Sequence, residues 1–182
     1  ISHFYIFSRL FSPAKPSGPQ RELFRVITRK TYGVICFALL LSLVGTVLGG
    51  IWANDSWGRF WGWDPKENGA FMIVLWNLII LHARMGGYVK ELGIHMLAVV
   101  GAIVVGFSWW YVNVMGVGLH SYGFTSGIKR NVLIFWCVEL VVLGLGTVVW
   151  LRARKAAAVA ENTPPGDKAR KGTRAGTPVP NN

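Results

Sequence analysis

The amino-acid sequence predicts an all-α fold, a polytopic membrane helical bundle with four transmembrane helices. Of its 182 residues, 52% are hydrophobic and 15% are charged, whereas a soluble domain carries about 25% charged residues. Long apolar runs alternate with short basic segments, and four of the runs reach the ~20 residues that a helix needs to cross a bilayer. Membrane topology therefore accounts for the formal net charge of +11 better than binding to nucleic acid does.

The expected spans cover residues 31–50, 65–83, 93–114 and 132–151. Asp64, Pro65 and Glu67 have the residue types and the spacing of an N-cap, a first-turn proline and a capping-box glutamate. This pattern predicts that the second helix begins at Pro65. It explains the segment as a helix start whether or not a ligand site lies beside it.

The segments that flank the spans differ from them in composition. Residues 1–30 combine the end of a preceding helix, a Pro-rich linker and a basic amphipathic segment expected on the cytoplasmic surface. Residues 152–182 are rich in Pro, Gly, Thr and charge, which predicts a disordered basic cytoplasmic tail. Because the sequence starts with Ile1 rather than Met and has no signal-peptide pattern, we expect it to be the C-terminal part of a longer polypeptide.

Basic residues are distributed unequally between the two sides of the expected spans. One side has nine of them, namely Arg21, Arg25, Arg29, Lys30, Arg84, Lys90, Arg152, Arg154 and Lys155. The other side has four, namely Arg59, Lys66, Lys129 and Arg130. Because Lys and Arg favour the cytoplasmic side, both termini are expected there. The loops at residues 51–68 and 115–130 then face outward together.

The loop expected at residues 51–68 is unusually aromatic. It contains five large aromatic residues, namely Trp52, Trp57, Phe60, Trp61 and Trp63. Trp57 and Trp61 would share a face if the loop were helical, and its glycines would let another group approach closely. Tryptophan is also common at membrane interfaces. Composition alone therefore leaves two interpretations open, a binding site for a flat ligand and an interfacial aromatic belt.

The order of the motifs resembles a family of haem-handling cytochrome c assembly proteins. IWANDSWGRFWGWDPKEN is followed by a span that ends in LH, by another span and then by GVGLHSYGF. That family carries a tryptophan-rich external "WWD" segment flanked by histidines. The Pro-Lys-Glu and LHSY motifs are more similar to the CcsA/ResC branch, the System II cytochrome c synthase, than to the CcmC or CcmF branches. The resemblance covers about residues 25–127, and it implies that residues 31–151 form a transmembrane haem-handling domain.

The resemblance implies a function in cytochrome c-type biogenesis, with haem b as the cofactor. The protein would bind haem, carry it across the membrane and present it externally for covalent attachment to a Cys-x-x-Cys-His segment of apocytochrome c. No residue has the character of a nucleophile or a general base, so membership of a holocytochrome c synthase stays open. Two alternatives remain: a transporter of haem or a small amphiphile without ligation activity, and a structural or quinone-binding subunit of a respiratory membrane complex.

Two histidines are the candidate ligands of haem iron, because neutral imidazole suits that metal. The resemblance implies that His120, in the external loop, is an axial ligand of external haem. It implies that His82 is a transmembrane ligand for haem arriving from the cytoplasmic side, roughly 25 Å below Pro65 at the helical rise per residue. The other haem-binding candidates lie in the aromatic loop, namely Trp52, Trp57, Arg59, Phe60, Trp61, Trp63 and Asp64, together with Asn68.

Neither iron site would be complete within this sequence. Residues 4–81 contain no histidine, although the family has one histidine before its tryptophan segment and one after it. The missing ligands are expected from chain before Ile1 or from a partner membrane subunit. His95 would lie across a short loop from His82, where pairing and simple packing are both open, and Glu139 is an intramembrane ionisable group of open role. We expect the protein in the bacterial inner membrane or an equivalent membrane, in contact with lipid.

Overall fold

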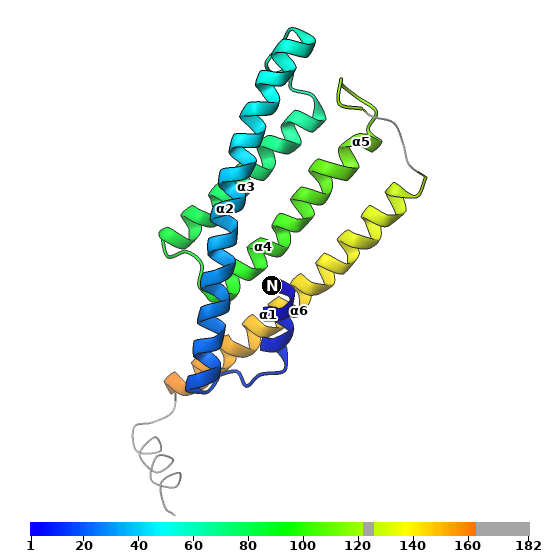
Figure 1. Ribbon diagram of the computed structural model, residues 1–182. Helices are drawn as coiled ribbons and strands as arrows, with labels where there is room; N and C mark the ends of the chain where they lie inside the picture. The colour runs from blue at the N-terminus through cyan, green and yellow to red at the C-terminus, as the bar shows by residue number, and fades with distance from the viewer. Residues whose placement is uncertain (122–125, 163–182) are drawn as a thin grey trace, which may run out of the picture.

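The computed structural model describes residues 1–121 and 126–162, and all regular secondary structure within them is helical (Figure 1). The elements in chain order are α1 (Ser2–Leu10), α2 (Gly18–Trp57), α3 (Pro65–Met85), α4 (Glu91–Gly106), the π-helical turn η1 (Phe107–Tyr111), α5 (Val112–Val114) and α6 (Ile128–Asn162). Within these described residues, four stretches are long and apolar enough to cross a membrane, namely Gly18–Trp57, Pro65–Met85, Glu91–Val114 and Ile128–Asn162. The prediction of an all-α polytopic bundle with four spans is confirmed.

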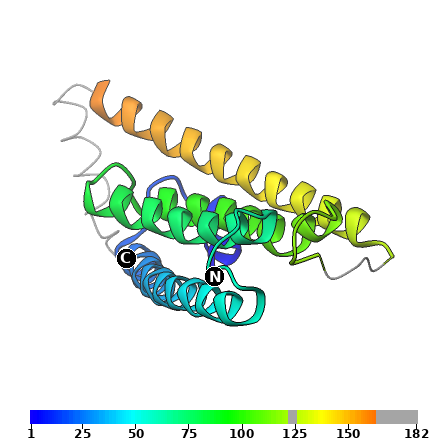
Figure 2. The same ribbon diagram turned by 90° about the horizontal axis from the view of Figure 1, so that it is seen from above.

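The long helices form a row in which neighbours in sequence pack together. α2 packs against α3, α3 against α4 and α4 against α6, while α1 lies against both α4 and α6. Seen from above, α2 and α6 occupy opposite sides of the row (Figure 2). The end of α2 and the start of α3 meet at one end of the bundle, and the turn η1 packs against α3 there. We call this end, with the connecting residues 58–64, the tryptophan end.

Two small buried clusters hold the row together. The first joins α1, α2, α4 and α6 through five residues, namely Tyr5, Ile6, Phe24, Val99 and Val142. The second joins α2, α3 and α4 through Ile35, Ile80 and Ile94. Many other large apolar side chains are exposed, above all along α2 and α6. Such surface is expected of helices whose outer faces meet lipid or further helices rather than water.

Helix α2 is longer than the expected first span, with 40 residues. It includes the basic segment before the span, and it continues past the expected end to Trp57, so only residues 58–64 of the expected loop 51–68 lie outside a helix. Gly58 ends α2 as a C-cap with a left-handed φ of 72°, which glycine adopts without steric cost. Because the chain turns at Gly58, Trp57 and Trp61 do not share a helical face.

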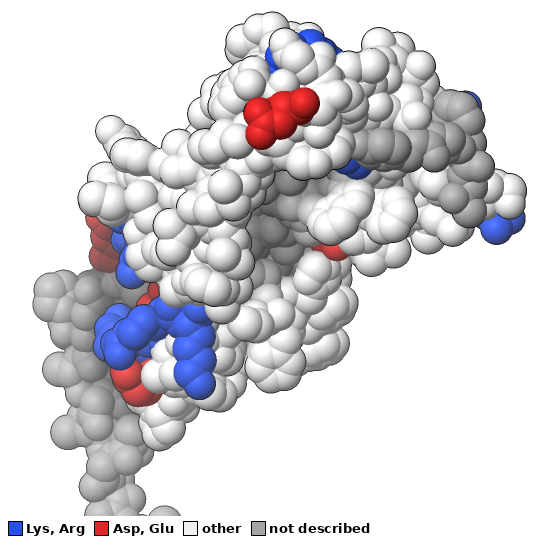
Figure 3. Space-filling view, turned by 45° about the horizontal axis from the view of Figure 1, so that its top comes forward, with Lys and Arg blue, Asp and Glu red and all other residues white. Residues whose placement is uncertain are grey.

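Charged residues are spread unevenly over the surface (Figure 3). The face in this view is mostly uncharged; its largest group of Lys and Arg side chains lies toward the lower left, and smaller blue areas appear at the top and right. In Figure 1 the start of α2 and the end of α6 lie at the lower end of the bundle, opposite the tryptophan end. There Arg152 of α6 donates to the Leu10 carbonyl of α1 at 2.6 Å, and Arg25 of α2 lies 3.8 Å from Glu91 of α4. Basic side chains therefore also help to join the helices at this end.

Candidate functional site

The first residues of α3 organise the candidate site. Asp64 is the N-cap, and its Oδ1 accepts the backbone N–H groups of Lys66 and Glu67, both at 3.0 Å. Glu67 in turn accepts the backbone N–H groups of Asp64 at 3.2 Å and Gly62 at 2.7 Å through its Oε2. This is the capping box predicted from the sequence, with one further bond to Gly62. The helix start therefore holds the connecting residues 58–64 against itself.

The same helix start stabilises an unusual backbone conformation at Trp63. Its φ of 59° lies in the left-handed region, where a non-glycine residue costs roughly 1–2 kcal/mol. The Asn68 amide donates to the Trp63 carbonyl at 3.0 Å, and Glu67 binds the N–H groups of the residues on both sides of Trp63. These bonds offset the backbone cost. The Trp63 side chain is left with 69% of its surface exposed.

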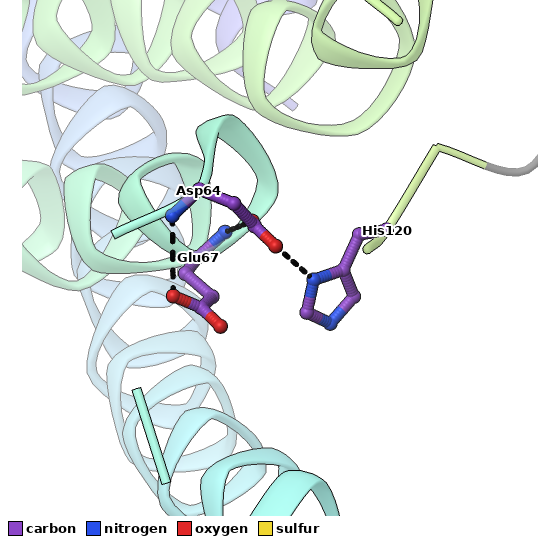
Figure 4. Close-up of side chains that lie close together, drawn as sticks. All are labelled: Asp64, Glu67 and His120. Atoms are coloured by element: carbon purple, nitrogen blue, oxygen red, sulfur yellow. Dashed lines mark hydrogen bonds and ion pairs between the residues drawn. The ribbon is translucent and has the colours of Figure 1, made fainter. Parts of the chain in front are cut away.

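His120 returns to this helix start after the chain has passed through η1 and α5 (Figure 4). Its Nδ1–H donates to Oδ2 of Asp64 at 2.6 Å. Glycine makes the approach possible: Gly118 has a φ of 87°, and a Cβ at this position would lie 2.5 Å from the Asp64 Cβ. The rings of His120 and Trp57 meet edge to face, with centroids 4.7 Å apart. The fold thus brings together three predicted haem-binding residues that are distant in sequence.

The hydrogen bond to Asp64 indicates the tautomer of His120. A neutral imidazole that donates from Nδ1 carries its lone pair on Nε2. Burial of Asp64 alone would raise the pKa of its carboxyl, but hydrogen bonds from His120 and from the backbone N–H groups of Glu67 and Lys66 outweigh burial and hold that pKa below its usual value. The Asp64 carboxylate therefore stays ionised at neutral pH and remains a strong acceptor for the imidazole N–H.

Arg59 places positive charge beside both carboxylates of the helix start. A guanidinium nitrogen lies 3.8 Å from Oδ2 of Asp64 and 4.0 Å from Oε1 of Glu67. At these distances Arg59 acts as a neighbouring charge rather than as a hydrogen-bond donor. A Cβ on Gly62 would overlap the guanidinium, so glycine at this position makes room for Arg59.

A cavity of about 260 Å³ opens between α2, residues 58–64, the first turns of α3 and His120. Besides small residues of α2, it is lined by larger side chains, namely Trp52, Phe60, Trp61, Lys66, Glu67 and His120. Nε1 of Trp61 is buried and has no hydrogen-bond partner among the described residues, so its N–H suits an acceptor on a ligand. Typical ligand pockets measure roughly 300–1,000 Å³, so this cavity is too small to enclose a large planar molecule completely.

The aromatic side chains at the tryptophan end do not form one stack. Trp52 meets Trp57 edge to face with centroids 5.0 Å apart, and Trp61 meets Trp63 in the same manner at 6.0 Å. Edge-to-face pairs leave ring faces available in several directions. Trp52 and Phe60 are about half exposed. The aromatic surface is therefore partly displayed on the outside of the bundle.

Comparison with known proteins agrees with the motifs. The family model described as "Cytochrome C assembly protein" matches residues 4–120, a stretch that includes the tryptophan end, Asp64 and His120. The chain belongs to the cytochrome c assembly protein family. The family predicted from the motifs is confirmed.

Several curated relatives of this cytochrome c assembly protein are described as "Cytochrome c biogenesis protein CcsA". The protein from Lolium perenne is 36% identical over 129 residues, which are 68% of this chain and 40% of the relative. The one from Agrostis stolonifera is 35% identical over 64% of this chain and 37% of the relative. The one from Drimys granadensis is 37% identical over 51% of this chain and 29% of the relative. The chain spans about 40% or less of the length of these relatives, and no solved structure matches it.

The second predicted iron ligand of this cytochrome c assembly protein, His82, lies far along α3 from Asp64. It is exposed in the last turn of the helix, and its Nδ1–H donates to the Leu78 carbonyl at 2.8 Å. This bond indicates the same tautomer as in His120, with the lone pair on Nε2. Because His120 contacts Asp64 at the start of α3 and His82 lies in its last turn, the two histidines lie at opposite ends of the bundle.

His95 does not pair with His82 but packs between α1, α2 and α4. It is fully buried, and its ring stacks on Tyr5 with centroids 3.7 Å apart. Because the Thr28 hydroxyl donates to a backbone carbonyl, it accepts the Nε2–H of His95 at 3.0 Å, and Nδ1 of His95 accepts from the Ser2 hydroxyl at 3.1 Å. His95 therefore joins three helices. Near it in the fold, the buried Glu139 of α6 lies 3.0 Å from Nε2 of His3 on α1.

Sequence reasoning missed two residues of the site, Lys66 and Glu67. Glu67 was identified only as a capping residue and Lys66 only as a topogenic charge, yet both line the cavity. The ligand atoms of Asp64, Glu67 and His120 lie within 4.8 Å of one another, a spacing that a metal ion would accept. Helix-capping bonds already engage both carboxylates, so the cluster is better described as a carboxylate–imidazole pair. The sequence contains a signal that could have identified Lys66 and Glu67 as site residues, because the polar residues at 64, 66 and 67 directly adjoin the aromatic segment.

Proposed function

We propose that this cytochrome c assembly protein holds haem at the tryptophan end, with His120 as one axial ligand of the iron, and presents it for covalent attachment to apocytochrome c. The observation that carries the proposal is the hydrogen bond of 2.6 Å from His120 to the Asp64 carboxylate, beside Trp57. Histidines that bind metals usually donate their other N–H to a carboxylate or carbonyl. Such a bond orients the ring and raises the basicity of the ligating nitrogen.

The side chains around the cavity support a planar amphipathic ligand with acidic groups. The indole and phenyl surfaces of Trp52, Phe60 and Trp61 suit an apolar macrocycle. The buried N–H of Trp61 and the cationic side chain of Arg59 suit carboxylates, for which charge-assisted hydrogen bonds are the stronger kind. Haem b combines an apolar ring with two propionates, so the donor set fits it.

In this proposal the chain contributes binding and orientation, and haem supplies the reactive vinyl groups. A thioether forms when a cysteine sulfur of a Cys-x-x-Cys-His segment adds to one vinyl carbon and the thiol hydrogen is delivered to the neighbouring carbon. The addition consumes no oxidant. The partial enclosure of the cavity supports this assignment, because a ring held by one edge keeps its other edge within reach of a peptide.

We further assign His82 to haem on the cytoplasmic side, before the haem is carried across the membrane. The exposure of His82 and its bond to the Leu78 carbonyl support a ligand role. The excess of basic residues on that side supports an outward-facing tryptophan end. The remaining axial ligands would come from further chain of a longer polypeptide or from a partner membrane subunit.

The test is co-purification of haem with the full-length polypeptide from cells that make cytochrome c. His120→Ala is expected to lower haem content about tenfold or more, the order found when metal ligation loses a key partner, and cellular holocytochrome c should fall with it. Added imidazole is expected to restore part of the haem spectrum. His3→Ala is the matched control, because His3 lies on α1 beside Glu139 and does not line the cavity. Unchanged haem content and spectrum in the His120→Ala protein would contradict the proposal.

A further inference from the structure

The start of α3 contacts the π-helical turn η1 through a lysine. Nζ of Lys66 donates to the Trp109 carbonyl at 2.6 Å and to Oδ1 of Asn113 at 3.3 Å. A charged donor to a backbone carbonyl at so short a distance is one of the stronger kinds of hydrogen bond. We infer that Lys66 is a positioning residue: by holding η1 and α5 it sets the place of the His120 imidazole. This inference rests on the proposed function, in which His120 is an iron ligand.

The turn η1 has a geometry that needs such support. The N–H of Val112 bonds to the Phe107 carbonyl, five residues back, which is the wide π pattern. The hydroxyl of Ser108, within the turn, is buried and has no hydrogen-bond partner among the described residues. Isolated π turns are rare and occur frequently at functional sites. Lys66 supports this turn from outside by binding its backbone at the Trp109 carbonyl.

Close packing of α3 against η1 adds to this contact. A Cβ on Gly69 would lie 2.9 Å from the Cα of Ser108, so the two backbones approach as near as glycine permits. Lys66 and Gly69 lie three residues apart on one face of α3. They hold η1 at two adjacent points.

The segment from Trp109 to His120 is thus tied to α3 at both ends. Lys66 binds its beginning at Trp109 and Asn113, and Asp64 binds its end at His120. Between these ties, the glycines at 116 and 118 have positive φ values and leave the backbone free to adopt other conformations. Without the first tie, the bond from Asp64 alone must hold His120 in place, and the imidazole would spend less time at the iron.

Lys66 also lines the cavity, so a direct contact between Lys66 and a haem propionate is the competing explanation. The two explanations differ in what added imidazole does. If Lys66 positions His120, free imidazole replaces the displaced ligand and restores the low-spin spectrum. If Lys66 binds the propionate, haem itself is lost and free imidazole cannot bring it back.

The experiment uses Lys66→Met in the full-length polypeptide, with His120→Ala and Lys129→Met in parallel. Lys129 is exposed in the first turn of α6 and serves as the matched lysine control. We expect Lys66→Met to lower the ratio of low-spin to high-spin ferrous haem about tenfold, the order for one lost charge-assisted hydrogen bond. Haem content per protein should fall no further than in the His120→Ala protein, and imidazole should restore it together with the low-spin bands. Lys129→Met should match the wild type.

Two outcomes would overturn the inference: an unchanged spectrum in the Lys66→Met protein, or a loss of haem that imidazole does not reverse. Lys66→Arg and Asn113→Leu guard against a folding defect, because the arginine variant retains the charge and Asn113→Leu removes only the longer bond. Lys66→Arg is expected to retain most of the low-spin signal, and Asn113→Leu to cause a smaller loss than Lys66→Met. If His120→Ala keeps the wild-type spectrum, the proposed function fails, and this result is read independently of the lysine variants.

Discussion

The imidazole of His120 lies 2.6 Å from the Asp64 carboxylate, although the two residues are 56 positions apart in sequence. Asp64 caps α3 with one oxygen and accepts the imidazole N–H with the other. A single carboxylate therefore both begins a helix and orients the candidate iron ligand. Four consequences of this arrangement and of its surroundings can be measured.

Asp64→Asn is expected to weaken haem binding while α3 remains capped. Asn is as good an N-cap as Asp, but its neutral amide is a weaker acceptor for the Nδ1–H of His120. Loss of such a carboxylate behind a ligating histidine typically costs about 10- to 100-fold in metal affinity. Haem titration of the purified full-length protein, followed at the Soret band, measures the effect.

The control for this variant is Asp55→Asn. Asp55 is an exposed carboxylate near the end of α2, so its substitution removes the same charge from the same end of the bundle. An equal loss of haem affinity in the two variants would show that Asp64 acts only through its charge and not through His120.

The lowered pKa of Asp64 predicts a pH dependence of stability. A carboxyl whose folded pKa lies below its unfolded value of about 4 stabilises the fold above that value and loses this contribution as pH falls through the folded pKa. The difference in unfolding temperature between wild type and Asp64→Asn should therefore be present at neutral pH and shrink below about pH 4. Scanning fluorimetry in detergent measures it, and a difference that stays constant into acid argues against the assignment.

Gly118→Ala is expected to displace His120 while the bundle stays folded. The φ of 87° is unfavourable for alanine, and the added Cβ would lie 2.5 Å from the Cβ of Asp64. The hydrogen bond between His120 and Asp64 should be lost, and haem content should fall about as far as in Asp64→Asn, on the order of tenfold or more. Gly144→Ala in α6 is the control, because a Cβ there meets nothing within 4 Å. Wild-type haem content in Gly118→Ala would mean that the loop accommodates alanine without displacing His120, and would contradict the prediction.

His95→Ala is expected to destabilise the bundle without changing the haem spectrum. The substitution removes a fully buried ring that stacks on Tyr5 and two hydrogen bonds, to Thr28 and Ser2. A loss of about 2–4 kcal/mol in the free energy of unfolding is reasonable for a cavity of this kind with unpaired hydroxyls. Chemical denaturation and the haem spectrum of the same sample test both parts. A changed spectrum would assign His95 to haem after all.

Hydropathy and helix-capping chemistry were sufficient to predict the four spans and the start of α3, because both depend on residues close in sequence. The end of α2 was placed too early. The apolar run stops near residue 50, but the helix continues until Gly58 supplies a left-handed C-cap. Helices end where the backbone can be capped, and hydrophobicity alone does not mark that position.

The contacts of the candidate site were harder to predict than its members. The histidine and tryptophan residues were found from their motifs, but the contacts of His120 with Asp64 and of Lys66 with Trp109 join residues distant in sequence. Such pairs depend on how α3, η1 and the following loop pack, and no local pattern encodes that packing. The role of His95 could not be predicted for the same reason, because its partners Thr28 and Ser2 come from α2 and α1.

The small size of the cavity between α2 and His120 bears on turnover. In the proposed function, haem held along one edge could leave sideways without movement of a helix, so the covalently modified product would need no gate. For the same reason, unmodified haem could dissociate before apocytochrome c binds. In the proposed function, the residence time of haem in this cavity would then limit the yield of holocytochrome c. A second surface that covered the exposed edge of haem would lengthen that time.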